Sequence, residues 1–169
     1  RTVQRLLPAL TADAIAAAIQ RKRDIEYGNL ADVVAASGAH ELLGILDQLR
    51  LPWAVVTNAD VRLAKARLGR AEINPPLLVS VEDVTDGKPD PEGYLLAASQ
   101  FKVPPSACLV VEDSGPGLAA GRAAGMRTVA LKGLDGDLLL ADLGQLTRMM
   151  RLGKCNGDAG APISAALDS

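Results

Sequence analysis

The sequence predicts an α/β protein with a parallel sheet that is covered by helices on both faces. The first observation is that short, continuously apolar runs alternate with segments of helical periodicity from residue 38 onward. Strands that are apolar along their whole length are typical of parallel sheets buried on both sides. The second is composition: apolar residues make up 49% of the 169 residues and aromatic residues only 2%, so alanine, leucine and valine must build the core. That length suits one such domain with a small addition.

A first helix is expected ahead of this core. Thr11 can act as the N-cap of a segment in which Ile15 and Ile19 fall on one face. The pattern fades at Gly28, because glycine is a common helix stop.

Four apolar runs predict strands, and helical patterns separate them. The strands are expected at residues 53–56, 77–80, 108–111 and 128–131. The helices are expected around Leu42 to Leu49, around Val61 to Leu68, from Pro91 onward, and over residues 117–125 and 138–150. The final residues are rich in Gly, Ala and Ser, and are expected as a flexible tail.

The helix after the second strand has a distinct start signal. Asp90 is expected as its N-cap, with Pro91 at the first helical position. Tyr94, Leu95 and Ala98 are expected on its buried face.

The charge balance argues against several classes of partner. Eighteen basic residues against 20 acidic ones leave a net charge of −2, which gives no sign of a nucleic-acid or anionic-membrane surface. No apolar run approaches the roughly 18 residues of a membrane span. Cys108 and Cys155 are not expected to form a disulfide, so a cytoplasmic location is expected. A monomeric state is expected as well. The chain does not start with Met, so the natural N-terminus is expected upstream.

Polar residues lie after the first two expected strands, near the strand ends where ligands bind in parallel sheets. Thr57 and Asn58 can hydrogen-bond an anion, with help from free backbone N–H groups at the next helix start. Lys88 lies between Gly87 and two prolines that restrict its backbone, so a phosphate-neutralising role is open to it. A simple helix cap and an ordinary surface lysine are the alternative interpretations.

Two adjacent carboxylates, Glu112 and Asp113, follow the third strand directly. They repel one another and lose hydration at the end of a buried strand, and a bound Mg²⁺ offsets both costs. A metal site is therefore favoured over a helix cap. The glycines at positions 115, 117 and 121 do not predict a nucleotide loop, because the acids stand where a pyrophosphate would approach; they indicate close packing of a helix on the sheet.

Taken in order, these motifs resemble the haloacid dehalogenase-like hydrolase superfamily, and among its members the sugar-phosphate phosphatases and β-phosphoglucomutase-like proteins. The resemblance rests on Val55-Val56-Thr57-Asn58, Gly87-Lys88-Pro89-Asp90-Pro91, Val110-Val111-Glu112-Asp113-Ser114 with Gly117, and Ala123-Ala124-Gly125. It covers about residues 38–150 and implies a Rossmann-like core. The residues before it look like the end of a helical cap, so the chain is expected to comprise a cap remnant (1–37), an incomplete core (38–152) and a tail (153–169).

The resemblance also implies roles for individual residues. Thr57 and the Asn58 backbone would hold the transferring phosphoryl group, and Lys88 would neutralise its charge. Glu112 and Asp113 would bind Mg²⁺, directly or through water. Dehalogenases of the superfamily need no metal and lack such an acid pair, so this pair favours phosphate chemistry.

One family motif is missing: an apolar strand ending in Asp-x-Asp-Gly-Thr, whose first Asp is the nucleophile. Asp135-Gly136-Asp137 has the spacing but follows no apolar strand, and is expected as a loop and helix cap. Either the first strand lies upstream of this sequence, or the chain is a non-catalytic phosphate-binding relative. The intact Thr57, Lys88 and acid pair favour the first interpretation.

The expected function is Mg²⁺-dependent hydrolysis of a small phosphorylated metabolite, a sugar phosphate, through an aspartyl-phosphate on an upstream Asp. A sugar-phosphate mutase is the alternative enzyme, and the isolated chain is expected to be inactive.

Overall fold

The computed structural model describes residues 11–28 and 30–155. Its α-helices are α2 (Ala12–Gly28), α3 (Ala39–Gln48), α4 (Val61–Arg70), α5 (Glu92–Phe101), α6 (Gly115–Ala123) and α7 (Leu143–Cys155), with short 3-10 helices at Val81–Asp83 and Pro105–Ala107. Its strands are β1 (Val55–Val56), β2 (Leu78–Val79), β3 (Leu109–Glu112), β4 (Arg127–Ala130) and β5 (Leu138–Leu139). Within the described ranges, no helix has the length and apolar character needed to cross a membrane.

The strands form two parallel groups. β1 pairs with β2, with Val55 opposite Leu78, and β3, β4 and β5 form a second sheet in that order. The prediction of parallel pairing is therefore confirmed. In the described part of the chain, β1 and β3 each have a single strand neighbour, so one edge of each is open.

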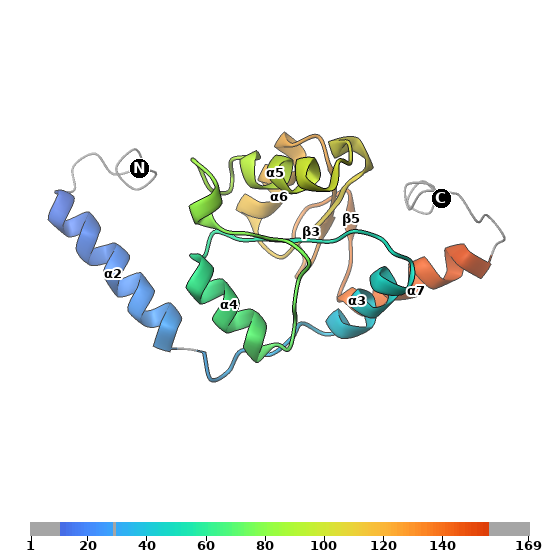
Figure 1. The fold of residues 1–169 in the computed structure, drawn as a ribbon, viewed down its shortest axis with the longest axis horizontal. Coiled ribbons are helices and arrows are strands. Elements are labelled where there is room, and N and C mark those ends of the chain that lie inside the picture. The colour runs from blue at the N-terminus through green and yellow to red at the C-terminus, as the bar shows by residue number, and fades with distance from the viewer. Residues whose placement is uncertain (1–10, 29, 156–169) are drawn as a thin grey trace.

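Helices cover both faces of the strands, as predicted. Figure 1 shows α5 and α6 together on one side and α3 beside α7 on another. Val110 of β3 belongs to a buried cluster under α5 and α6 that also takes in Val56 of β1. The neighbouring β3 residue Val111 packs instead on a cluster around Val129 and the helices α3 and α7. Successive side chains of a strand point to opposite faces, so this alternation places an apolar core on each side.

α2 is set apart from the layers in Figure 1. Its start agrees with the prediction, since the Ala14 backbone N–H donates to Thr11 Oγ1 over 3.2 Å. At its other end the Tyr27 hydroxyl donates to Asp60 Oδ1 over 2.8 Å, which ties α2 to the first turn of α4.

The last predicted helix, over residues 138–150, is wrong in its first part. Leu138 and Leu139 form β5, and Leu138 lies opposite Val129 of β4. The Asp142 carboxylate accepts a hydrogen bond from the Gln145 backbone N–H and so caps α7, which begins at Leu143. A run of three leucines fits a strand or a helix equally well, so periodicity alone misplaced the boundary. α7 then continues to Cys155, into the segment expected as a tail; the rest of that expectation, residues 156–169, lies outside the described residues.

Two details of the other helix starts also differ from the predictions. α6 begins at Gly115 with Ser114 as its N-cap, two residues earlier than expected. α5 begins at Glu92 after Pro91, although the Asp90 carboxylate does accept from the Glu92 backbone N–H at 2.9 Å. Tyr94 and Ala98 are buried as predicted.

Leu95 was expected on the buried face of α5, but it is 39% exposed. Tyr94, Ala97 and Ala98 form the buried stripe instead. Leu95 is one residue on from Tyr94 and therefore about 100° around the helix axis.

Candidate active site at the strand ends

The sequence-predicted site residues lie at the carboxyl ends of the parallel strands. Thr57 and Asn58 follow β1, Glu112 ends β3, and Asp113 comes directly after it. Lys88 approaches from the loop before α5. The structure brings Lys88 into contact with both Asn58 and Glu112, which come from different strands.

The centre of the site is an ion pair between the Lys88 ammonium and Glu112 Oε1. Both side chains are close to buried, with exposed fractions of 12% and 10%. Charges that lose this much hydration are stable only when they are paired and hydrogen-bonded, so the two residues depend on each other.

Tyr94 completes this pair from α5. Its hydroxyl donates to Glu112 Oε1 over 2.7 Å and accepts from Lys88 Nζ over 3.3 Å. The Lys88 ammonium also lies 5.2 Å from the centroid of the Tyr94 ring, within cation–π range. Burial, and then the hydrogen bond to Glu112, raise the pKa of Tyr94 far above its usual value of 10.0, so the hydroxyl remains a donor.

The second Glu112 oxygen is held by the start of α6. Ser114 Oγ donates to Glu112 Oε2 over 2.8 Å and accepts from the Gly117 backbone N–H over 3.2 Å. A Cβ at Gly117 would overlap the Glu112 carboxylate, so the chain needs glycine there. The carboxylate therefore lies at the N-terminal end of α6, where the helix dipole is positive.

Asn58 acts on Lys88 through its side chain. Asn58 Oδ1 accepts from the Lys88 backbone N–H at 2.8 Å, and Asn58 Nδ2 donates to the Lys88 carbonyl at 2.9 Å. Gly87 allows this approach, because a Cβ there would come within 2.7 Å of Asn58 Oδ1. From the sequence, the Asn58 amide was expected to be able to hydrogen-bond an anion, and the family resemblance implied a role for its backbone; the side-chain contact with Lys88 was not predicted.

Thr57 is half-buried beside this pair. Its hydroxyl accepts from the Ala59 backbone N–H over 3.1 Å, in the turn that leads to α4. The N-cap of α4 is Asp60, which accepts from the Leu63 backbone N–H, so Thr57 is not the helix cap considered as the alternative from the sequence. The contact with Ala59 leaves the Thr57 hydroxyl proton available as a donor.

Asp113 forms an ion pair with a different lysine, Lys132, which lies just after β4. Lys132 Nζ lies 2.5 Å from Asp113 Oδ2, and the side chains are 72% and 49% exposed. The hydrogen bond to Asp113 raises the pKa of Lys132. Sequence analysis missed Lys132, although a lysine directly after a predicted apolar strand belongs at the same sheet edge.

The acid pair suits a hard divalent cation by its chemistry. Glu112 and Asp113 offer carboxylate oxygens, the ligand type that Mg²⁺ prefers, and each already attracts a protein ammonium. Across residues 11–28 and 30–155, no group of three or more His, Cys, Asp or Glu side chains is placed to hold a metal. The pair can therefore hold Mg²⁺ only together with further oxygen ligands.

The Asp135-Gly136-Asp137 segment is a loop, as predicted, but it caps no helix. Asp137 precedes β5 and accepts from the Thr128 backbone N–H at 2.6 Å and from its hydroxyl at 2.8 Å. Asp135 pairs with Arg122 of α6 at 3.3 Å. Both carboxylates therefore have structural partners.

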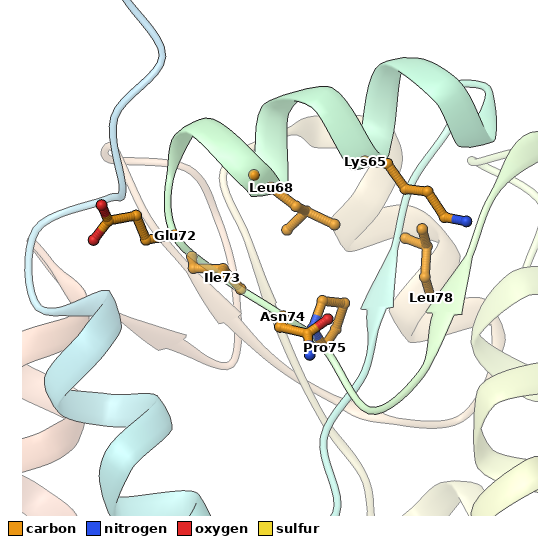
Figure 2. Close-up of a pocket in the computed structure, with 8 residues that line it drawn as sticks. Lys65, Leu68, Glu72, Ile73, Asn74, Pro75 and Leu78 are labelled. Carbon is orange, nitrogen blue, oxygen red and sulfur yellow. The ribbon is translucent and has the colours of Figure 1, made fainter.

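A pocket of about 370 Å³ lies elsewhere, between α4 and the segment leading into β2 (Figure 2). Its lining consists of Lys65, Leu68, Gly69, Glu72, Ile73, Asn74, Pro75 and Leu78. Leu78 begins β2, so this pocket opens at the amino end of that strand, whereas the paired polar groups gather at carboxyl ends. It is not the candidate active site.

Comparison with known families decides the affiliation. The sequence profile of the haloacid dehalogenase-like hydrolases matches residues 2–125, well over half of the chain. The chain belongs to the haloacid dehalogenase-like hydrolase family. The resemblance seen in the sequence motifs is thereby confirmed.

Several relatives of this haloacid dehalogenase-like chain are phosphatases. Hexitol phosphatase A from Escherichia coli is 36% identical over 141 residues, which cover 79% of this chain and 65% of that protein. N-acetylmuramic acid 6-phosphate phosphatase from Pseudomonas aeruginosa is 43% identical over 98 residues, covering 56% of this chain and 43% of that protein. A candidate β-phosphoglucomutase from Thermotoga maritima superposes with a TM-score of 0.62 at 28% identity, over 68% of this chain and 59% of that chain. The chain spans between 43% and 65% of the length of these relatives.

Proposed function

We propose that this chain forms most of a Mg²⁺-dependent phosphomonoester hydrolase that acts on a small phosphorylated metabolite, a sugar phosphate. The observation that carries the proposal is the buried Lys88–Glu112 pair at the strand ends. A lysine held this firmly beside a carboxylate suits neutralisation of a phosphoryl group, and the similar phosphatases support the reaction class.

The residues of this chain would bind and orient the phosphoryl group. The Thr57 hydroxyl and the Asn58 backbone N–H would donate hydrogen bonds to its oxygens, and the Lys88 ammonium would balance their charge. Asn58 fixes the backbone of Lys88, so the ammonium is positioned before substrate arrives. Mg²⁺ held by Glu112 and Asp113 with other oxygen ligands would supply further stabilisation of negative charge in the transition state.

The attacking group in this proposal is an Asp outside the sequence, on a strand between β1 and β3. Its carboxylate would attack phosphorus, displace the sugar alkoxide, and form an aspartyl-phosphate that water then hydrolyses to inorganic phosphate. Two features support that position for the strand. The facing edges of β1 and β3 are open in the described part of the chain, and Val56 and Val110 share one apolar cluster.

A sugar-phosphate mutase is a second candidate, favoured by the likeness to the candidate β-phosphoglucomutase. A phosphatase transfers the phosphoryl group to water, whereas a mutase returns it to a sugar hydroxyl. Release of inorganic phosphate without an isomeric sugar phosphate would support the phosphatase.

The test uses the protein extended upstream through its first strand. It is assayed on a panel of sugar phosphates with Mg²⁺ and after chelation, and we expect turnover only with the metal. Metal-independent turnover would contradict the role given to Glu112 and Asp113. We expect no turnover from the 169-residue chain; activity there would show that its nucleophile is internal. An upstream sequence without an apolar strand ending in Asp-x-Asp would favour the non-catalytic alternative.

A further inference from the structure

Lys132 is a second cation at the strand ends, and its partner is one of the two carboxylates assigned to the metal. Its ammonium lies 2.5 Å from Asp113 Oδ2. The Lys88–Glu112 pair is enclosed by Tyr94 and Ser114, but the Lys132–Asp113 pair faces solvent. Asp113 is therefore the carboxylate whose partner can exchange with little rearrangement.

The backbone at Lys132 is unusual for a lysine. Its φ is +57°, Gly133 follows with φ +74°, and the Leu134 backbone N–H donates to the Leu131 carbonyl over 3.3 Å. Two successive residues with positive φ make the tight turn that asparagine and glycine adopt most readily.

Other non-glycine residues with positive φ end helices in this structure. Arg50 follows α3, Glu72 follows α4 and Lys102 ends α5, which is the ordinary left-handed helix termination. Among the described residues, Lys132 alone of this group follows a strand. The turn places its side chain across the end of β3, where it meets Asp113.

We propose that Lys132 is a built-in competitor for the metal: its ammonium occupies Asp113 when Mg²⁺ is absent and weakens Mg²⁺ binding at the acid pair. The inference rests on the proposed function, since it takes Glu112 and Asp113 as metal ligands. Mg²⁺ can use Asp113 Oδ2 only after the ammonium leaves it. An ammonium that remains nearby repels the incoming cation.

The size of the effect follows from the exposure of the pair. Exposed ion pairs are worth so little that breaking one changes an affinity by about two- to fivefold. Screening by salt should reduce the effect further, because the Debye length falls from about 30 Å at 0.01 M to about 10 Å at 0.1 M. Lys132 thus adjusts metal affinity without abolishing the site.

The test measures Mn²⁺ binding to the protein extended upstream through its first strand by electron paramagnetic resonance, with Mn²⁺ as a stand-in for Mg²⁺ of the same oxygen preference. Lys132→Met should bind Mn²⁺ about two- to fivefold more tightly than wild type at low salt, and the gap should narrow at high salt. Lys132→Arg keeps the charge and should restore the weaker affinity. Lys65→Met removes an exposed lysine on α4 and should leave the affinity unchanged.

Asp113→Asn separates failure of this inference from failure of the metal assignment. If Mn²⁺ binding is lost in Asp113→Asn but Lys132→Met binds as wild type does, the metal site stands and the competitor role of Lys132 is overturned. If Asp113→Asn binds as well as wild type, or none of the proteins binds Mn²⁺, the metal assignment fails for this chain and the inference fails with it.

Discussion

At the scale of single residues, Glu112 is the most constrained carboxylate of the site. One oxygen meets Lys88 and Tyr94, and the other accepts from Ser114. Contacts from the lysine loop, α5 and the start of α6 therefore fix its rotamer. In the proposed function, the metal would meet a carboxylate that is already oriented, so little conformational entropy would be lost on binding.

Asn58 should control how firmly the Lys88 loop is held. Asn58→Ala removes two hydrogen bonds to the Lys88 backbone. Loss of a bond worth about 1–1.5 kcal/mol should speed hydrogen exchange at the Lys88 amide by roughly fivefold to tenfold. Amide exchange followed by NMR checks this. Asn74→Ala, an exposed asparagine ahead of β2, is the matched control and should leave the Lys88 amide unchanged. Equal exchange in wild type and Asn58→Ala would contradict the assignment.

At the scale of elements, α6 reaches the sheet because it carries small residues on one face. A Cβ at Gly121 would lie 3.1 Å from Thr128 Cγ2 and 3.2 Å from Val110, tighter than ordinary contact. The sequence interpretation of these glycines as packing residues agrees with this. Gly117 also makes room for a site residue, since the Glu112 carboxylate fills the space that a Cβ would occupy.

Gly117→Ala should therefore destabilise the chain through Glu112. The new methyl would displace a carboxylate that is held on both oxygens, at a cost of about 1–3 kcal/mol in the free energy of unfolding. Gly115→Ala is the matched control in the same first turn, because nothing lies within 4 Å of a Cβ there. Urea unfolding of both variants measures the difference. If the two variants are equally stable, the Glu112 carboxylate can move away from the new methyl group at little cost, and the expected steric conflict is contradicted.

The loop between β4 and β5 should carry a pH-dependent part of the stability through Asp137. Hydrogen bonds from the Thr128 backbone, and then from its hydroxyl, hold the pKa of Asp137 below its ordinary value of 3.8. A lowered folded-state pKa means that this stability is present above 3.8 and is lost as the pH falls through the folded-state pKa.

Asp137→Asn should remove that contribution, which solvent screening limits to about 1 kcal/mol. Unfolding free energies measured between pH 3 and 6 should show a shallower acid dependence in this variant. Asp135→Asn changes the same charge on a side chain that is 96% exposed, and should retain the wild-type dependence. If the unfolding free energy of Asp137→Asn depends on pH as that of wild type does, groups other than Asp137 cause the loss of stability in acid.

At the scale of the whole molecule, strand-and-helix alternation was predictable because it depends on local apolar pattern. The parallel pairing, the Thr11 cap and the meeting of Lys88 with the polar strand ends followed from that pattern and from sheet geometry. The contacts of Tyr94 and Lys132 were not predictable, since they join segments 18 and 19 residues apart through side-chain direction. Sequence spacing carries no information on such directions. The predicted helix over residues 138–150 was wrong in its first part, because three consecutive apolar residues fit the periodicity of a strand and of a helix equally well.

The hydrogen bonds within the two strand groups indicate which backbone amides of β1 and β3 point to an open sheet edge. The Val55 and Thr57 amides donate to β2, so the alternation of a parallel strand turns the Val56 amide toward the open edge. In β3, the carbonyls of Cys108 and Glu112 accept from residues on the β4 side. The amides of Leu109 and Val111 must therefore face the opposite, open edge.

We expect the amides of Val56, Leu109 and Val111 to exchange rapidly in the 169-residue chain and to become protected when the protein is extended upstream through its first strand. A strand inserted between β1 and β3 would accept from all three, since each points into the same gap. The Thr57 amide, bonded to the Val79 carbonyl at 2.9 Å, is the internal control and should be protected in both proteins. Hydrogen–deuterium exchange by NMR makes the comparison. Unchanged exchange of the three amides in the extended protein would place the added strand elsewhere, and with it the carboxylate that the proposed mechanism requires beside Lys88 and Glu112.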